Sequence, residues 1–192
     1  MSMITAEAYD IHVEQLFAKM KRMHAALDQA GLPYRVVGGV AIFLQIFERD
    51  PGKARMTRDI DIAVNRRDLA KIEAAARRHG FLYRPVAGVD MLLDESNPRA
   101  STAVRLIFVR EKVRPEYLEP VPDFSDPTRT AEGILLAPVR DLVLMKLTSF
   151  RLKDKVHIQD MDSVGLITAE IEASLSETLR ARDWPKSAPP NN

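Results

Sequence analysis

Hydrophobic residues recur along the chain with two different spacings, which predict helices in some segments and strands in others. Between residues 7 and 30 the spacing is close to that of a helix, and Gly31 and Pro33 end this run. Short apolar runs bounded by turn residues predict strands. The predicted helices span residues 7–30, 40–47, 68–79, 138–151, 153–164 and 168–180. The predicted strands span residues 34–37, 60–64, 81–86, 89–93 and 103–109.

Polar and proline-rich segments separate these elements. Residues 49–58 form a polar, basic loop, and residues 94–101 form a second loop. Residues 114–130 contain four of the prolines and predict an irregular surface excursion. Regular structure resumes directly after this excursion, so we interpret it as part of the domain and not as a linker.

The length and composition are those of a globular domain. A chain of 192 residues is long enough for one medium domain, and 46% apolar with 29% charged residues is an ordinary balance. We expect a single domain over residues 1–182. Its core should lie at about 34–110 and a helical C-terminal part at about 138–182, followed by a flexible tail over residues 183–192.

Charge and cysteine content exclude several classes of protein. The net charge of +1 creates no overall field that would recruit nucleic acid or a membrane. The absence of cysteine excludes disulfides and thiolate metal sites and is typical of a reducing compartment. The N-terminus lacks the apolar core of a leader, and no apolar run approaches membrane-spanning length. We therefore expect a cytoplasmic protein without a membrane partner.

Two aspartates, Asp59 and Asp61, stand at the start of the apolar strand predicted at 60–64. Residues two apart in a strand point to the same face, so the two carboxylates should project together while Ile60 and Ile62 enter the core. Two carboxylates this close repel each other unless a cation lies between them. Magnesium prefers oxygen ligands and commonly takes one or two carboxylates plus substrate phosphates. The pair therefore predicts a site for Mg²⁺, or for Mn²⁺.

A glycine pair, Gly38-Gly39, lies between the strand at 34–37 and the helix that follows it. Glycine lets the backbone approach a ligand closely, and the N-terminus of a helix offers free N–H groups to an anion. The basic loop between the glycines and the aspartates carries Lys53, Arg55 and Arg58, which can neutralise phosphate charge. These features together predict a nucleotide phosphate beside the metal.

Each of these features has a plainer interpretation when it stands alone. Most glycine pairs are simple turns, and aspartates often flank exposed strands. The order strand, glycine pair, helix, basic loop and Thr-x-Asp-x-Asp strand is much more specific than any of its parts, and it favours the functional interpretation.

The motifs carry a resemblance to a known superfamily. Val37-Gly-Gly-Val-Ala-Ile, followed by Met56-Thr-Arg-Asp-Ile-Asp-Ile, resembles motif I of the nucleotidyltransferases with the DNA polymerase beta-like fold. Within that superfamily the chain is most similar to bacterial AbiEii-like toxins and related small nucleotidyltransferase proteins. The later motifs read Leu144-Met-Lys-Leu and Arg151-Leu-Lys-Asp, and the resemblance covers roughly residues 34–163.

The resemblance implies an α+β fold in which a mixed β-sheet is flanked by helices, with C-terminal helices and catalysis at one sheet edge. It implies that Lys146 contacts the nucleotide triphosphate and that Asp154 or Asp160 is the later acidic residue. If one helix ran through this region, Lys146, Lys153, His157 and Asp160 would share a narrow stripe. We expect His157 to be a helix-surface or packing residue, with general base as its alternative role.

One position departs from the pattern of the superfamily. Many active members carry a third carboxylate on a later strand, where this chain has Arg105. An arginine stays protonated and cannot bind a metal. Glu111, or Asp94 and Glu95, could supply the missing acid. Alternatively, Arg105 binds a substrate phosphate and one metal with Lys146 performs the reaction, or transfer is lost.

The leading hypothesis is a magnesium-dependent nucleotidyltransferase that moves an NMP from an NTP to a hydroxyl acceptor, which could be an RNA end, a protein or a small molecule. The same hypothesis includes a toxin-like role with an antitoxin partner. The alternative is a catalytically degenerate nucleotide-binding or interaction module. We assign catalysis to Asp59, Asp61, Lys146 and Asp154, and the metal to Asp59 and Asp61. We assign nucleotide binding to Gly38, Gly39, Thr57, Arg58, Arg105 and Lys153.

Overall fold

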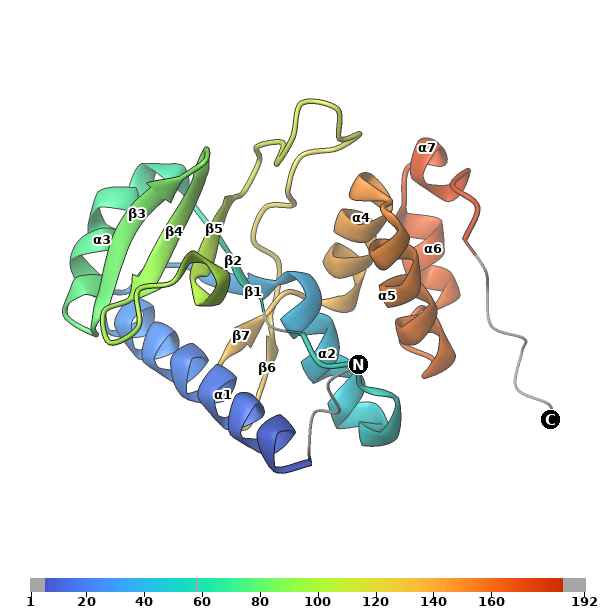
Figure 1. Ribbon diagram of the computed structural model, residues 1–192. Coiled ribbons are helices and arrows are strands. Elements are labelled where there is room, and N and C mark those ends of the chain that lie inside the picture. Colours follow the sequence, from blue (N-terminus) through green and yellow to red (C-terminus); the bar gives the residue numbers. More distant parts are fainter. Residues whose placement is uncertain (1–5, 58, 185–192) are drawn as a thin grey trace.

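The computed structural model describes residues 6–57 and 59–184, so Arg58 and most of the predicted tail lie outside the described residues. Figure 1 shows the arrangement of the elements in that part of the chain. The α-helices are α1 (Ala6–Gln29), α2 (Gly38–Arg49), α3 (Leu69–Arg77), α4 (Val139–Ser149), α5 (Leu152–Ser163), α6 (Ala169–Ser174) and α7 (Glu177–Arg180). The strands are β1 (Tyr34–Val37), β2 (Ile60–Val64), β3 (Phe81–Val86), β4 (Val89–Asp94), β5 (Val104–Phe108), β6 (Thr128–Arg129) and β7 (Leu135–Leu136).

The strands form a mixed seven-stranded sheet within the described ranges, in the order β3-β4-β5-β2-β1-β7-β6. Strand β2 pairs with β5 and β1 pairs with β7 in parallel, whereas the other neighbours are antiparallel. A mixed sheet flanked by helices confirms the predicted α+β fold. None of the helices that the structure describes is both long and apolar enough to cross a membrane.

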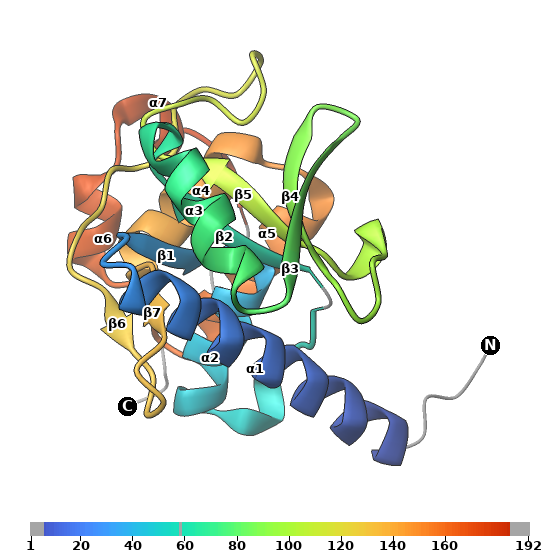
Figure 2. The same ribbon diagram turned by 90° about the vertical axis from the view of Figure 1, so that its left-hand side faces the viewer.

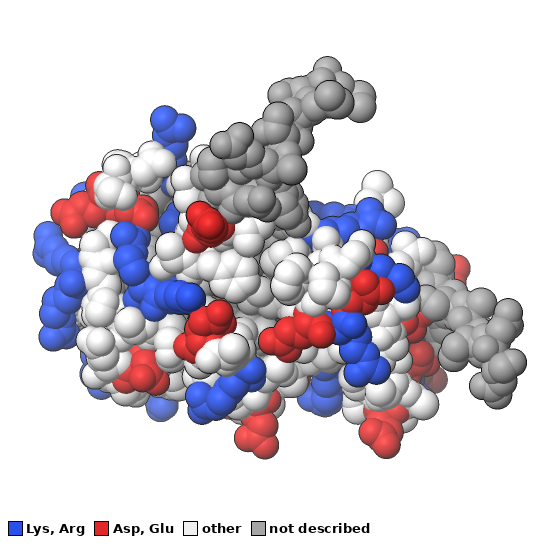
Figure 3. Space-filling view, turned by 90° about the horizontal axis from the view of Figure 1, so that it is seen from below, with Lys and Arg blue, Asp and Glu red and all other residues white. Residues whose placement is uncertain are grey.

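The helices lie on both sides of the sheet. In Figure 2, α1 and α3 lie in front of the sheet, and α4 and α5 lie behind it. Strand β5 shows how the sequence separates the two faces: Val104, Leu106 and Phe108 are buried, whereas Arg105 and Ile107 are half-buried. The side chains of β5 therefore alternate between buried and half-buried positions. Lys, Arg, Asp and Glu side chains are interspersed over the described part of the face in Figure 3.

The strand register fixes the neighbours of Asp61. On one side Asp61 lies opposite Val37, the last residue of β1, and on the other side it lies opposite Arg105 of β5. Because Gly38 directly follows Val37, Asp61 has the glycine turn on one side and the arginine on the other. The centre of the sheet thus brings together three sequence features that lie far apart in the chain.

Two of the predicted segments differ from the structure. The irregular excursion ends in β6, and β7 follows it; each strand has two residues, too few for hydrophobic periodicity to reveal. The helix predicted at 168–180 is instead α6 and α7. They are separate because Leu175 is extended and the hydroxyl of Ser176 accepts a hydrogen bond from the N–H of Leu179, which starts a new helix.

Helices α4 and α5 are separate, as predicted, so the stripe that one continuous helix would give from Lys146 to Asp160 does not form. Phe150 has a left-handed backbone with φ of 48°, which ends α4. Arg151 is the N-cap of α5, and its backbone N–H donates to the carboxylate of Asp154 at 3.1 Å. The break turns the chain sharply and brings the start of α5 back toward the end of α4.

Candidate active site

A cleft of about 470 Å³ opens between the central strands and helices α4 and α5. Gly38, Gly39, Thr57, Asp59, Asp61 and Arg105 line it from the side of the sheet and α2. Lys146, Arg151, Lys153 and His157 line it from α4, α5 and their connection. Asp154 is buried directly behind Lys146. The structure therefore places every described residue of the predicted site in or against one cleft, and only Arg58 lies outside the described residues.

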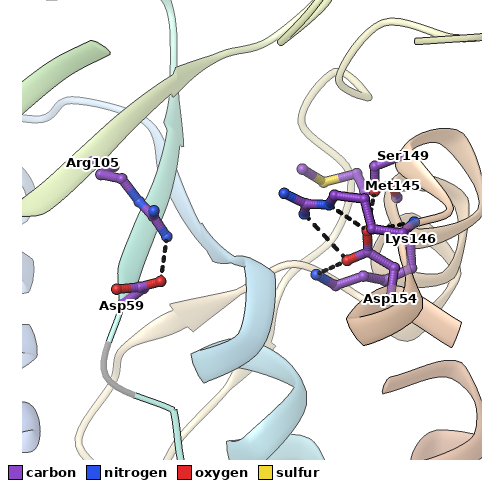
Figure 4. A network of polar contacts seen from close by, with 7 residues as sticks. Asp59, Arg105, Met145, Lys146, Ser149 and Asp154 are labelled. Carbon is purple, nitrogen blue, oxygen red and sulfur yellow. Dashed lines mark hydrogen bonds and ion pairs between the residues drawn. The ribbon is translucent and has the colours of Figure 1, made fainter. Parts of the chain in front are cut away.

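The two aspartates hold an arginine between them. Arg105 Nε lies 2.6 Å from Asp61 Oδ1, and Arg105 Nη2 lies 3.0 Å from Asp59 Oδ2. Figure 4 shows the Arg105–Asp59 pair on the strand side of the cleft. Burial would by itself lower the pKa of Arg105, but Asp61 and Asp59 raise it overall, so the guanidinium stays charged. Arg105 therefore faces the same side of the sheet as the two aspartates and is ion-paired to both.

Gly38 brings the start of α2 against Asp61. Its φ of +71° is a left-handed conformation, and a Cβ at this position would lie 2.4 Å from Asp61 Oδ2. The N-cap residue is Val37, whose apolar side chain cannot accept from the first N–H groups of the helix. An anion beside Asp61 and a bound cation would therefore meet free backbone N–H groups.

Gly39 lies close to Thr57 and His157. A Cβ on Gly39 would be 2.9 Å from Thr57 Oγ1 and 3.5 Å from His157 Cε1. Burial, and after it the charge of Lys146, lowers the pKa of His157 to about 4, so its ring is neutral near pH 7. Among the described residues, His157 Nδ1 is buried without a hydrogen-bond partner. Of the two expected settings, the outer helix surface does not apply, because His157 is half-buried and lines the cleft.

Lys146 forms a buried ion pair across the break between the two helices. Its Nζ lies 2.9 Å from Asp154 Oδ1, and the side chains are 9% and 0% exposed. Asp154 Oδ2 also accepts from Ser149 Oγ at 2.8 Å and from Arg151 Nε at 2.7 Å. Figure 4 shows this cluster on the helical side of the cleft. The carboxylate is thus fully engaged, and it fixes the position of the lysine.

The surroundings lower the pKa of both members of this pair, which disfavours the charged form of Lys146 and favours the charged form of Asp154. Burial lowers the pKa of Lys146, and Asp154 offsets part of that effect. Burial would raise the pKa of Asp154, but hydrogen bonds from Arg151 and the charge of Lys146 hold it well below its usual range. Asp154 is therefore ionised at neutral pH and supplies the charge that Lys146 needs in the interior.

The structure separates the two candidates for the later acidic residue. Asp154 contacts Lys146, whereas Asp160 lies 2.9 Å from Arg55 Nε. Lys53 donates to the backbone carbonyl of Ser163 at 3.0 Å. Lys53 and Arg55, which were expected to be able to neutralise phosphate charge, do not line the cleft, and their side chains contact α5 instead.

The substitute acids considered for the Arg105 position are engaged elsewhere. Arg66 binds the carboxylate of Glu111 through two nitrogens, with Nη2 2.6 Å from Oε2. Asp94 lies 2.6 Å from Arg22 Nη2, and neither Asp94 nor Glu95 lines the cleft. No group of three or more His, Cys, Asp or Glu side chains suited to a metal occurs within residues 6–57 and 59–184. Asp59 and Asp61 lie together at the glycine end of the cleft, whereas Glu111, which also lines the cleft, is paired with Arg66.

Three residues of the site carried little signal in the sequence. Arg151 and Ser149 hold Asp154, and Thr148 lines the cleft. The buried Thr148 Oγ1 has no hydrogen-bond partner in the described part of the chain. Arg151 stands in the Arg-x-Lys-Asp motif, which was the available signal. The other two become recognisable only once the left-handed turn at Phe150 is known.

A scan of the sequence against protein-family models finds no match, and a search of curated proteins finds none either. Solved structures do match. A crystal structure of ANT(2'')-Ia in complex with adenylyl-2''-tobramycin has a TM-score of 0.55 at 14% identity, over 87% of this chain and 95% of that chain. The chain has the nucleotidyltransferase fold.

A solution structure of the antibiotic-resistance factor ANT(2'')-Ia also matches, with a TM-score of 0.50 at 16% identity, over 83% of this chain and 86% of that chain. Identities this low establish the fold. The superfamily fold that the motifs predicted is thereby confirmed, and the narrower likeness to AbiEii-like toxins stays a prediction.

Proposed function

We propose that this nucleotidyltransferase-fold protein is an enzyme that moves an NMP from an NTP to a hydroxyl acceptor and depends on Mg²⁺ or Mn²⁺. The observation that carries the proposal is the position of Asp59 and Asp61. Their carboxylates share one cleft with the glycine start of α2 and with Lys146. This arrangement offers ligands for a cation on one side and donors for phosphate on the other.

The residues present fit a hard divalent cation. Two carboxylates supply oxygen ligands, and substrate phosphates can complete the set, which is the arrangement that Mg²⁺ commonly takes. The close approach of Asp61 Oδ2 to Gly38 leaves no room for a side chain at that point. When bound, the cation would neutralise charge on the phosphates and hold them in position.

The protein's own groups would bind and orient the triphosphate. Backbone N–H groups at Gly38 and Gly39 would donate to phosphate oxygens, and Lys146 and Lys153 would neutralise their charge. Thr57, with Arg58 beside it in the sequence, would contact the same phosphates. The acceptor oxygen then forms a bond to the α-phosphorus, the bond to the bridging oxygen breaks, pyrophosphate leaves, and the hydroxyl proton passes to water. Positioning and charge neutralisation supply most of such catalysis.

The acceptor could be an RNA end, a protein hydroxyl or a small molecule. The structure of ANT(2'')-Ia with adenylyl-2''-tobramycin places an aminoglycoside among the molecules to test. A toxin-like role with an antitoxin partner, and a cytoplasmic location, belong to the same proposal.

Calorimetry and a transfer assay test the proposal together. We expect the full chain to bind at least one of the four Mg-NTPs, and Asp61→Asn to weaken that binding about tenfold or more, the loss already typical of residues that only support a metal ligand. Asp160→Asn is the matched control, because Asp160 pairs with Arg55 and should leave affinity unchanged. With α-labelled NTP, label should pass to total RNA, protein or tobramycin. If no NTP binds in the presence of Mg²⁺ or Mn²⁺, the proposal is wrong.

A second candidate function is a nucleotide-binding module without transfer activity. The ion pairs of Arg105 with both aspartates favour it, because the guanidinium occupies the side of the pair where a third acid is expected. Binding of an NTP without transfer of label to any of the acceptors would support this candidate.

A further inference from the structure

Asp61 lies between two neighbours of opposite character. The register places Val37 and then Gly38 on the β1 side, and Arg105 on the β5 side. The two oxygens of the carboxylate follow this division. Oδ1 accepts from Arg105 Nε at 2.6 Å, whereas Oδ2 is the atom that a Cβ on Gly38 would approach to 2.4 Å. One carboxylate oxygen of Asp61 therefore accepts from the Arg105 guanidinium, and the other faces the start of α2.

Arg105 also engages Asp59, so it acts on the pair as a unit. Its Nη2 lies 3.0 Å from Asp59 Oδ2, and its side chain is 33% exposed. On its other side in the sheet, Arg105 lies opposite Met91 of β4, which offers no charge. Both aspartates therefore hold the guanidinium by ion pairs.

Enzymes that displace a phosphoryl group with two metals keep the ions about 3.5–4 Å apart and share carboxylates between them. Two such ions bound by Asp59 and Asp61 would occupy both the Gly38 side and the β5 side of Asp61. A planar guanidinium with fixed charge fills the β5 side and repels a divalent ion there. The two carboxylates and the guanidinium sum to one negative charge, which one divalent cation converts to one positive charge.

On the basis of the proposed function, we infer that Arg105 permanently takes the place of a second metal ion, so that the cleft takes up one divalent cation, on the Gly38 side of Asp61. The guanidinium then supplies the second positive charge at the carboxylate pair. Arg105 is in this interpretation a residue that sets the metal stoichiometry of the site.

The stoichiometry of Mn²⁺ tests the inference without any measurement of transfer. The full chain is titrated with Mn²⁺ in the presence of a non-hydrolysable NTP analogue, and free Mn²⁺ is followed by electron paramagnetic resonance. Wild type should bind one Mn²⁺ per chain. Arg105→Lys keeps the charge and should also bind one, whereas Arg105→Asp adds an oxygen ligand and should bind two. Arg105→Asn provides a neutral oxygen donor, should also bind two, and replaces Arg105→Asp if that variant does not fold.

The outcomes separate the inference from the function on which it rests. Two Mn²⁺ ions bound by wild type would overturn the inference but not the proposed function, because the second ion would then bind despite the Arg105 guanidinium. A folded Arg105→Asp or Arg105→Asn variant that still binds one ion would overturn it as well. Absence of Mn²⁺ and nucleotide binding in wild type would contradict the proposed function, and the inference would fall with it.

Discussion

Lys146 and Asp154 form an ion pair of 2.9 Å between two side chains that are almost completely buried, at the junction of α4 and α5. Removing one member of such a pair leaves an uncompensated charge in the interior, which costs about 3–5 kcal/mol. We therefore expect Asp154→Ala to lower the free energy of unfolding, measured by urea denaturation, by about this amount. Asp160→Ala is the control, because its partner Arg55 is well exposed, and its cost should stay below about 1 kcal/mol.

The reverse substitution should behave differently. Lys146→Met leaves Asp154 with its hydrogen bonds from Arg151 and Ser149, so the loss of stability should be smaller than for Asp154→Ala. Nucleotide affinity should nevertheless fall, because the ammonium group that faces the cleft is gone. Equal losses of stability in the two variants would contradict this division of roles, as would unchanged nucleotide affinity in Lys146→Met.

The two glycines should respond differently to a side chain. Gly38 has a φ of +71°, so Gly38→Ala should cost at least about 1–2 kcal/mol of stability from backbone strain alone. Gly39 has ordinary helical geometry, but a larger side chain would meet Thr57 Oγ1. We expect Gly39→Val to fold, with a modest loss in melting temperature, and to lose nucleotide binding.

Thermal melts and calorimetry on the same preparations distinguish the two effects. The strain expected for a valine at a left-handed position belongs to Gly38 and not to Gly39. A folded Gly39→Val variant with undiminished nucleotide affinity would remove the glycine pair from the phosphate site.

His157 should make stability depend on pH. Its pKa is about 4 in the folded protein against an ordinary value of 6.5. Between these values the unfolded chain binds a proton that the folded protein does not, so the contribution of the neutral ring is present above pH 6.5 and lost as pH falls toward 4. We expect the melting temperature of His157→Gln to fall less than that of wild type between pH 7 and 4.5.

A direct titration checks the same point. The ring protons of His157, followed by nuclear magnetic resonance, should shift well below pH 6. A midpoint near the ordinary value of 6.5 would show that the ring is solvated, and that its place in the cleft is wrong.

Hydrophobic periodicity predicted the larger elements because burial acts over many residues. It located β1 to β5 and helices α1 to α5 within a few residues. It missed β6 and β7, since each has two residues and owes its position to pairing with a distant partner. It also joined α6 to α7, because helical spacing of apolar residues does not reveal a local cap such as Ser176.

The site was predictable where residues are close in the sequence and less so where the fold brings them together. Asp59 and Asp61 share a face by strand geometry alone. Lys146 and Asp154 are eight positions apart, which in one continuous helix would separate them by about 12 Å along the axis. The left-handed residue Phe150 removes that separation. The sequence offered no sign that an aromatic residue would take this conformation.

Gly38 has a consequence for how related sequences should be compared. Its left-handed backbone is required by the passage from β1 into α2, and a side chain there would collide with Asp61. A descendant that had lost all catalysis would still lose stability if this glycine were replaced. Its presence in a relative is therefore evidence of a shared fold. An active enzyme would be distinguished from an inactive relative by both aspartates and by the residue at position 105.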